Sequence, residues 1–268
     1  MAEIRDASGR PFARRTVALG SVALELYEGG EGRSLLFLHD ATGLAQSAAV
    51  LAELARRFHV LAPLHPGFDG AALPGWMSSV DDFAHAHLEL ARRQGLERAI
   101  VVGASLGGWV AAEMATKTTH FIDRLVLIAP VGIKVGAVDR LDVPDIFAMK
   151  ESELDRRLYA EPEKFRLDPA GKSDAELAIV AQNRETLALV GWEPYLHNPK
   201  LKHRLSSIDR PTLVLRGAQD GLVSHDYAES FARLIPGARL ESIAGAAHLA
   251  HVERPAPVAE RIVRFAGE

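Results

Sequence analysis

The chain of 268 residues contains no cysteine. Disulfide bonds, thiolate-bound zinc and a cysteine nucleophile are therefore excluded. A chain of this length buries about three quarters of the surface that it exposes when unfolded, so it needs neither a disulfide nor a structural metal to be stable. Its hydrophobic content of 48% is ordinary for a globular protein with a core of its own.

Long apolar runs and long basic runs are also missing. The longest apolar runs, at residues 99–102 and 125–130, are far shorter than the ~20 residues of a membrane-spanning helix. The first ten residues are polar, unlike a secretory signal. The net charge is −4 and basic residues occur only in short scattered pairs, so we expect no nucleic-acid partner. The sequence predicts a cytoplasmic protein that binds neither membranes nor nucleic acid.

Strands and helices alternate in the first half of the chain. Short continuous apolar runs such as SLLFLH are typical of strands that are buried on both faces. We expect strands at residues 16–19, 22–27, 34–39, 59–63, 99–103 and 125–129, and helices at residues 46–57, 80–93 and 106–118. This alternation predicts an α/β fold with a mostly parallel sheet covered by helices on both faces.

The alternation stops between residues 131 and 205. This stretch contains five prolines and no buried-strand pattern, but helical patterns occur at residues 152–159 and 174–190. About 75 residues are too many for a plain loop in a compact domain. We therefore predict a helical cap at residues 131–205, inserted into a core domain of residues 1–130 and 206–268. The expected core elements resume with strands at residues 212–216 and 239–243, a helix at residues 225–234 and a final helix after His248.

The segment AIVVGASLGGWVAAEM carries the clearest chemical signal. A buried strand runs into the turn at residues 103–107, and a helix follows at once. A serine on so sharp a turn needs unusual backbone angles, and Gly103 and Gly107 relieve the crowding around it. The turn lifts the Ser105 hydroxyl clear of the sheet and points the Leu106 N–H toward any oxyanion that forms. Ser105 is therefore the candidate nucleophile.

Two further candidates follow predicted strands in the second half of the chain. A serine nucleophile needs a base, because its hydroxyl is barely ionised at neutral pH, and a third group must hold that base in one tautomer. His248 follows the strand at residues 239–243, and Asp220 follows the strand at residues 212–216. All three candidates therefore follow the carboxyl ends of predicted parallel strands, where open α/β sheets place their sites. Their order along the chain is the one expected for a serine on such a turn.

On these residues the chain resembles the α/β-hydrolase superfamily, and especially its small, cap-bearing members: carboxylesterases, epoxide hydrolases, haloalkane dehalogenases and carbon–carbon bond hydrolases. The resemblance runs from about Val17 to Phe265. It rests on the segments LLFLHDATG, LAPLHPGFDGA, VVGASLGGW, PTLVLRGAQDGLV and AGAAHLAHVERP, in the family's order. Dehalogenases and epoxide hydrolases of this group carry aspartate where this chain carries Ser105. The resemblance therefore implies a serine hydrolase that acts on esters or carbon–carbon bonds.

The resemblance also selects between competing bases and acids. In relatives the catalytic histidine stands five residues before a glutamate and seven before a proline, a spacing that His248 matches and His251 does not. For His251 we expect a packing or surface role. Some relatives place the acid after the strand that here ends at residue 129, but Pro130-Val131-Gly132 offers none. Asp226 lies too far beyond its strand, so Asp220 remains.

One position departs from the family pattern. Relatives usually have His-Gly before the residue whose backbone N–H completes the oxyanion hole, whereas this chain reads His39-Asp40-Ala41. By position the two donors are Ala41 and Leu106. Asp40 replaces a glycine that is free to adopt positive φ, which aspartate tolerates better than most residues. Its carboxylate has three open roles: it points outward, it stays protonated, or it acts as a second acid.

No cofactor is required for this chemistry, and no metal site is predicted. His85 and His87 are two residues apart on a predicted helix, so they point to different faces, and no HExxH-type spacing occurs. We expect His65 to be structural or to border the pocket. Two roles remain open for five apolar residues of the insertion, as walls of a substrate pocket or as packing within the cap: Val135, Ile146, Phe147, Met149 and Trp192.

The expected partner is a small-molecule acyl substrate, and the favoured reaction is hydrolysis of a small or medium carboxylic ester through an acyl-enzyme. One alternative is hydrolysis of a carbon–carbon bond in a dienoic keto acid, for which Arg156, Arg157 or Arg184 would hold the carboxylate. A second alternative is a slow-turnover ligand-binding protein on the same fold. The sequence does not distinguish a monomer from a homodimer.

Overall fold

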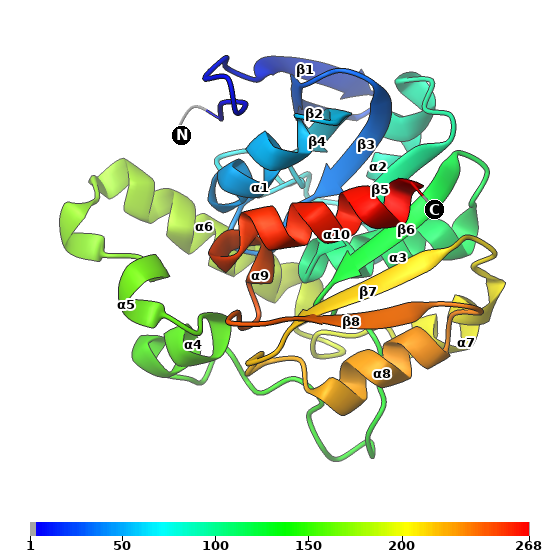
Figure 1. Cartoon of the computed structure of the whole chain (residues 1–268). Coiled ribbons are helices and arrows are strands. Elements are labelled where there is room, and N and C mark those ends of the chain that lie inside the picture. The colour runs from blue at the N-terminus through cyan, green and yellow to red at the C-terminus, as the bar shows by residue number, and fades with distance from the viewer. Residues whose placement is uncertain (1–3, 268) are drawn as a thin grey trace.

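The computed structural model describes residues 4–267 (Figure 1). Its central element is a sheet with the strand order β1-β2-β4-β3-β5-β6-β7-β8. The first two pairings, β1 with β2 and β2 with β4, are antiparallel, and all the others are parallel. This confirms the predicted α/β fold. The strands are β1 (Ala13–Leu19), β2 (Val22–Gly29), β3 (Arg33–Leu38), β4 (Phe58–Pro63), β5 (Ala99–Ala104), β6 (Ile122–Ile128), β7 (Thr212–Gly217) and β8 (Arg239–Ile243).

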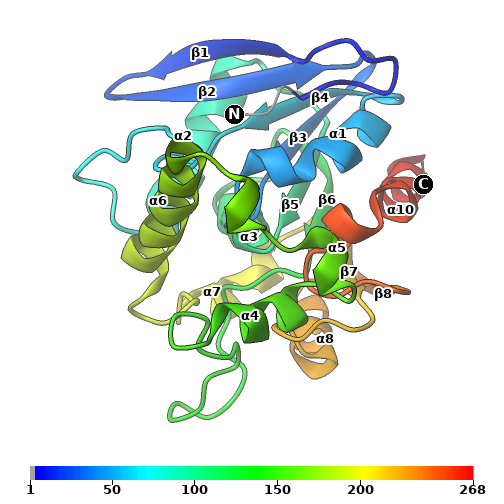
Figure 2. The ribbon, with the colours of Figure 1, turned by 90° about the vertical axis from the view of Figure 1, so that its left-hand side faces the viewer.

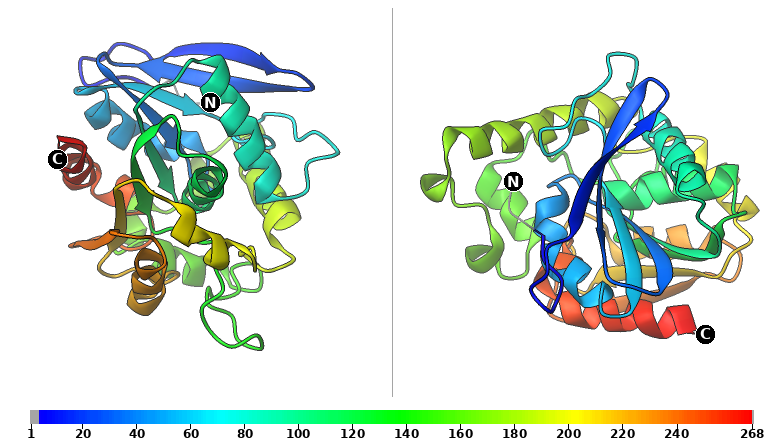
Figure 3. Two further views of the ribbon diagram at one scale, coloured as in Figure 1. Left: turned by 90° about the vertical axis from the view of Figure 1, so that its right-hand side faces the viewer. Right: turned by 90° about the horizontal axis from the view of Figure 1, so that it is seen from above.

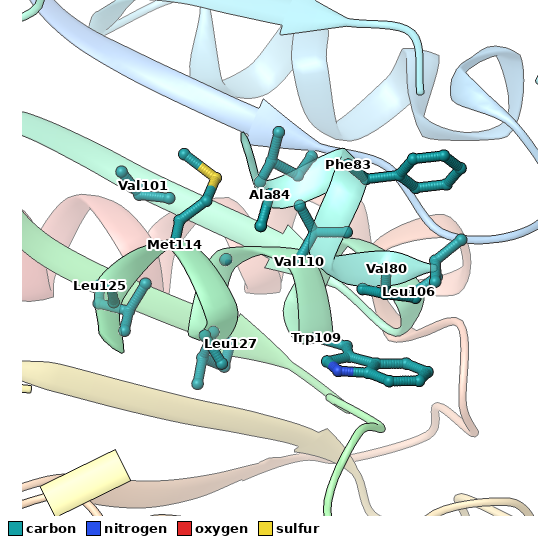
Figure 4. Packing of buried hydrophobic residues seen from close by; sticks show 14 of the residues in the cluster. Val80, Phe83, Ala84, Val101, Leu106, Trp109, Val110, Met114, Leu125 and Leu127 are labelled. Atoms are coloured by element: carbon teal, nitrogen blue, oxygen red, sulfur yellow. The ribbon is translucent and has the colours of Figure 1, made fainter. Parts of the chain in front are cut away.

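Helices cover both faces of the sheet, as Figures 1 and 3 show. One face packs against α1 (Ala48–Leu54) and α10 (Pro255–Gly267). The other face packs against α2 (Val80–Arg93), α3 (Leu106–Lys117) and α8 (His225–Arg233). In Figure 4, the side chains of Val110 and Met114 on α3 lie between α2 and the strands.

The extent to which a strand is buried explains its pattern of apolar and polar residues. All six residues of β5 are buried, because β3 and β6 pair with its two edges and helices cover its faces. The edge strand β1 instead exposes its first four residues. Helix α2 begins with a capping box, in which Ser79 and Asp82 each accept a hydrogen bond from the backbone N–H of the other.

Several predicted boundaries are wrong. The strand expected at residues 16–19 begins at residue 13. The helix expected at residues 46–57 is a 3₁₀ turn at Leu44–Ser47 followed by α1, which ends at residue 54 because the N–H groups of Arg56 and Arg57 bond to carbonyls three residues back. The strand expected at residues 125–129 begins at residue 122, where charged side chains at the sheet end hide its apolar pattern. The final helix is broken into α9 (Ala250–Glu253) and α10, since Pro255 has no N–H to donate.

The segment between β6 and β7 contains α4 (Glu151–Leu158), α5 (Pro162–Phe165), α6 (Asp174–Gly191) and α7 (Leu201–Arg204). Helices α4, α5 and α6 lie together at one end of the sheet (Figure 2). Helix α7, at the end of the predicted cap, packs against α3, and its Leu201 is buried in the same core cluster as that helix. The division into a core and a cap with bounds at residues 131 and 205 stays a prediction.

Within residues 4–267, the structure has no helix of the length and apolar character that crossing a bilayer requires.

Candidate active site

Ser105 lies on the sharp turn between β5 and α3. Its backbone has φ 49° and ψ −108°, a strained conformation for a residue other than glycine. The two flanking glycines are required by space, since a Cβ at Gly103 would lie 2.2 Å from the Gly107 carbonyl oxygen. A Cβ at Gly107 would lie 2.1 Å from the carbonyl oxygen of Leu38. The turn predicted from the sequence is thus present, with the serine at its apex.

The structure brings Ser105, His248 and Asp220 together at the carboxyl ends of β5, β8 and β7. The His248 Nε2 lies 2.8 Å from the Ser105 Oγ, and its Nδ1 lies 3.1 Å from one Asp220 carboxylate oxygen and 3.2 Å from the other. A carboxylate can only accept, so the proton is on Nδ1 and Nε2 can accept from the serine hydroxyl. The N–H groups of Leu222 and Val223 bind Asp220 Oδ1 at 2.9 and 2.8 Å and fix the carboxylate.

Ala41 and Leu106, the expected oxyanion donors, both line the cavity into which Ser105 opens. Leu106 is the first residue of α3, so its N–H lies among the helix-start groups that lack an intrahelical acceptor. Asp40 also lines this cavity, but it does not have the positive φ that a replaced glycine suggested. Positive φ occurs instead at Gly43 (φ 102°).

The cavity has a volume of about 210 Å³. One side is formed by residues that follow the carboxyl ends of the strands. The other is formed by residues of the segment from α4 to α6 (residues 151–191) and of the stretch before it. Of the five apolar residues considered from the sequence, Ile146 and Phe147 line it, whereas Val135, Met149 and Trp192 do not. Trp192 packs its ring against Phe147 from outside, with centroids 5.4 Å apart. Further apolar walls come from Val131, Val143, Leu154, Leu158, Leu167, Val180, Leu187, Leu196, Leu222 and Leu249.

Residues 35–261 match the family model described as the alpha/beta hydrolase family. The chain belongs to the α/β-hydrolase family. A pimeloyl-[acyl-carrier protein] methyl ester esterase of Vibrio vulnificus (strain CMCP6) is 26% identical over 256 residues, which cover 89% of this chain and 96% of that protein. A 2-hydroxy-6-oxo-2,4-heptadienoate hydrolase of Pseudomonas putida (strain F1) is 27% identical, with 90% and 91% of the two chains covered. The family and its esterase relatives support a hydrolase.

Solved structures share this fold. A serine hydrolase from the polyaromatic-hydrocarbon-degrading bacterium Cycloclasticus zankles superposes with a TM-score of 0.79 at 19% identity, covering 96% of this chain and 98% of that one. A carboxylesterase of Bacillus subtilis superposes with a TM-score of 0.73 at 21% identity, covering 95% and 91%. At these identities the likeness concerns the fold.

In this α/β-hydrolase, Glu253 anchors the segment that carries His248. One oxygen of its buried carboxylate accepts the N–H of Ala247 at 2.7 Å. The other accepts the N–H groups of Ala160 and Glu161, at 2.9 and 3.1 Å, from the turn between α4 and α5. In the sequence, Glu253 is only a spacing marker for His248. Its burial shows that its carboxylate needs these hydrogen-bond partners.

His251 lies in a different environment from the one expected. It is buried, as a packing role requires, with its ring centroid 6.2 Å from that of Phe37. Its Nε2, however, lies 2.9 Å from the Oδ2 of Asp40, which is buried as well. Burial raises the pKa of Asp40, but hydrogen bonds from His251 and Thr42 outweigh this and bring that pKa down to about 2. The burial of Asp40 excludes the outward orientation left open for it, and the lowered pKa disfavours the protonated state.

Three buried histidines form a hydrogen-bonded chain behind this loop. His65 Nε2 donates to the His39 carbonyl at 2.9 Å, which leaves His65 Nδ1 to accept from His87 Nε2 at 2.7 Å. His39 Nε2 accepts from the His65 N–H at 3.0 Å. Burial lowers the pKa of all three, that of His87 to about 3. All three rings are therefore neutral and structural, which includes the role expected for His65.

The described residues contain no group of three His, Asp or Glu side chains placed to hold a metal ion.

Proposed function

We propose that this protein is a serine hydrolase that cleaves a small or medium carboxylic ester through an acyl-enzyme. The observation that carries the proposal is the hydrogen-bonded series from Asp220 through His248 to Ser105, which ends in a largely apolar cavity. A strained serine with a base 2.8 Å from its hydroxyl is the geometry that nucleophilic catalysis needs.

In the first step, the Ser105 Oγ attacks the ester carbonyl carbon while its proton passes to His248 Nε2. Asp220 stabilises the imidazolium that forms and keeps the ring oriented. The N–H groups of Leu106 and Ala41 hold the oxyanion of the tetrahedral intermediate. Loss of one such donor raises the barrier by about 3 kcal/mol.

In the second step, the intermediate collapses and its carbon–oxygen bond to the alcohol breaks. The leaving alcohol takes the proton from His248. Water then attacks the acyl carbon and gives a proton to the same nitrogen, and Ser105 is released with its hydroxyl restored as the acid product departs. This cycle uses side chains and backbone of the chain itself.

The cavity favours a short, uncharged acyl group. Its volume of about 210 Å³ lies below the usual range for drug-sized ligands. Glu151 and Asp155 line it on the α4 side, against one cationic side chain, that of Arg184. Burial and the neighbouring charge of Glu151 raise the pKa of Asp155. A negatively charged group on the substrate would therefore be disfavoured beside these two carboxyl groups.

A second candidate function is hydrolysis of a carbon–carbon bond in a dienoic keto acid. One relative is named as such a hydrolase. Of the three arginines considered for its carboxylate, Arg184 lines the cavity. Arg157 instead binds the Gly221 carbonyl and Glu153, and Arg156 lines a separate polar cavity. The two carboxylates opposite Arg184 make the ester the better-supported substrate.

The test is labelling with a fluorophosphonate probe, followed by kinetics. We expect the wild-type protein to be labelled at Ser105 and Ser105→Ala to remain unlabelled; equal labelling of both would refute the proposed nucleophile. Steady-state rates on p-nitrophenyl esters of increasing chain length, beside a ring-cleavage dienoate, separate the two reactions. Slow single-turnover hydrolysis with tight retention of the product would instead identify a ligand-binding protein.

A further inference from the structure

A second carboxylate–imidazole pair lies beside the first. Asp40 Oδ2 and His251 Nε2 are 2.9 Å apart, and each side chain is 1% exposed. Asp40 directly precedes Ala41, and His251 lies three residues after His248. The pair therefore joins the loop that bears one proposed oxyanion donor to the segment that bears the proposed base.

The other oxygen of Asp40 shapes the loop itself. Oδ1 accepts both the backbone N–H and the hydroxyl of Thr42, each at 2.6 Å. A bond from a carboxylate to the N–H two residues on is an Asx-turn. Ala41 lies between Asp40 and Thr42 in this turn. Its N–H has no acceptor within residues 4–267. The turn thus satisfies its neighbour and leaves the Ala41 N–H free for a ligand in the cavity.

The rest of this loop is fixed independently of His251. The Thr42 carbonyl accepts from the Asn183 side chain at 3.1 Å, and the Leu44 N–H donates to Asp69 at 2.7 Å. On the other side, Nδ1 of His39 donates to the Asp40 carbonyl oxygen at 2.7 Å. These bonds hold the backbone on both sides of Ala41. In the described part of the chain, His251 alone binds the second oxygen of the Asp40 carboxylate.

Among residues 4–267, the ring of His251 has no other hydrogen-bond partner. Its Nδ1 is buried without a hydrogen-bond partner, and because a carboxylate can only accept, Nε2 carries a proton that is directed at Asp40. An apolar side chain would fill this site beside Phe37 without leaving a buried nitrogen unpaired. The polar ring is thus held there for a single contact.

We propose that Asp40 and His251 are positioning residues for the oxyanion hole: His251 holds the Asp40 carboxylate in the Asx-turn that aims the Ala41 N–H into the cavity. This inference rests on the proposed serine-hydrolase function. It explains how the loop works with aspartate at a position that glycine occupies in the family pattern.

The test compares His251→Phe, which removes the donor, with His251→Gln, which keeps an N–H near the position of Nε2. Each variant is assayed on an ester and on the matching thionoester, whose carbonyl sulfur accepts hydrogen bonds weakly. For His251→Phe we expect kcat on the ester to fall about tenfold to a hundredfold, part of the 10²- to 10³-fold loss that removal of a whole donor causes. KM and the thionoester rate should change less than threefold, and His251→Gln should stay within about threefold of wild type in both assays.

Equal losses on ester and thionoester, a loss confined to KM, or a wild-type kcat in His251→Phe would each overturn the proposal. If His251→Phe does not fold by circular dichroism, Thr42→Val removes one bond of the same turn and must show the same selective loss on the ester. A wild-type protein whose Ser105 is not labelled by a fluorophosphonate refutes both the proposed function and this inference. Labelling at Ser105 with no selective loss in the variants refutes only the role of the pair.

Discussion

The two carboxylate–histidine pairs of this molecule are built from the same groups but with opposite ring orientations. His248 presents Nδ1 to Asp220 and leaves Nε2 to face Ser105 in the cavity. His251 presents Nε2 to Asp40 and leaves Nδ1 among apolar side chains without a partner. The nitrogen that is not bound to the carboxylate therefore decides what each pair can do, and only the first pair can move a proton to or from a substrate.

The largest expected effect comes from removing the imidazole of His248, compared with removing that of His251. His248→Ala should lower kcat on an ester by about 10⁴- to 10⁶-fold, because the serine then has no base. The alanine variant of His251 should lose no more than about a hundredfold. Steady-state kinetics of the two purified variants measure both effects, and similar losses would contradict the division of roles.

Replacement of Asp220 should likewise lower kcat more than replacement of Asp40. In Asp220→Asn, the amide N–H₂ faces His248 Nδ1 and favours the tautomer with the proton on Nε2, which cannot accept from Ser105. We expect kcat to fall about 10⁴-fold. In Asp40→Asn, the amide oxygen can still accept from Thr42, and we expect a loss of only about tenfold. Equal losses in the two kcat values would mean that Asp40 belongs to the proton-transfer series.

His87, the member of the neutral histidine chain that does not touch the oxyanion loop, sharpens the contrast, because we expect it to affect stability and not turnover. The pKa of His87 is about 3 in the folded protein, below its ordinary value of 6.5, so the unfolded chain binds more protons as the pH falls below 6.5. Its contribution to stability is full above that pH and is lost progressively toward pH 3. At pH 5 the loss is about 2 kcal/mol for this one group.

His87→Gln keeps a donor toward His65 but cannot titrate. The free energy of unfolding, measured by urea denaturation between pH 7 and pH 5, should therefore fall less in this variant than in the wild type. A variant and a wild type with parallel pH dependence would show that the pKa of His87 does not change on folding.

The smallest expected effect is that of the charged side chains of Arg184 and Glu151, which line the cavity, on kcat/KM for charged substrates. Arg184 and Glu151 are exposed, so single charges there have effects that solvent weakens. We expect Arg184→Gln to lower kcat/KM on an anionic ester about threefold, and Glu151→Gln to raise it by a similar factor. A neutral ester of the same length is the control and should respond to neither change.

The first pair could be predicted from the sequence and the second could not. The Ser105 turn is a local pattern, since the glycines that flank it report the backbone directly. Asp220 and His248 each follow a recognisable strand, and parallel strands bring their ends together. Contact between Asp40 and His251 instead depends on how two side chains orient across 211 positions of sequence, which no periodicity encodes.

The pocket walls were unpredictable for a similar reason. Ile146 and Phe147 face the cavity while Met149 does not, within one irregular stretch where no helix or strand fixes which side chains point inward. The Glu253 anchor was also missed, because its acceptor role depends on the N–H groups of a turn more than 90 residues earlier.

That anchor has a mechanical consequence. The corner between α4 and α5 shares one carboxylate with the residue before His248, and the Leu158 carbonyl accepts a bond from the N–H of the residue after it. An opening motion at this corner would therefore displace His248, the proposed general base. Substrate is therefore expected to enter the cavity without opening of this corner.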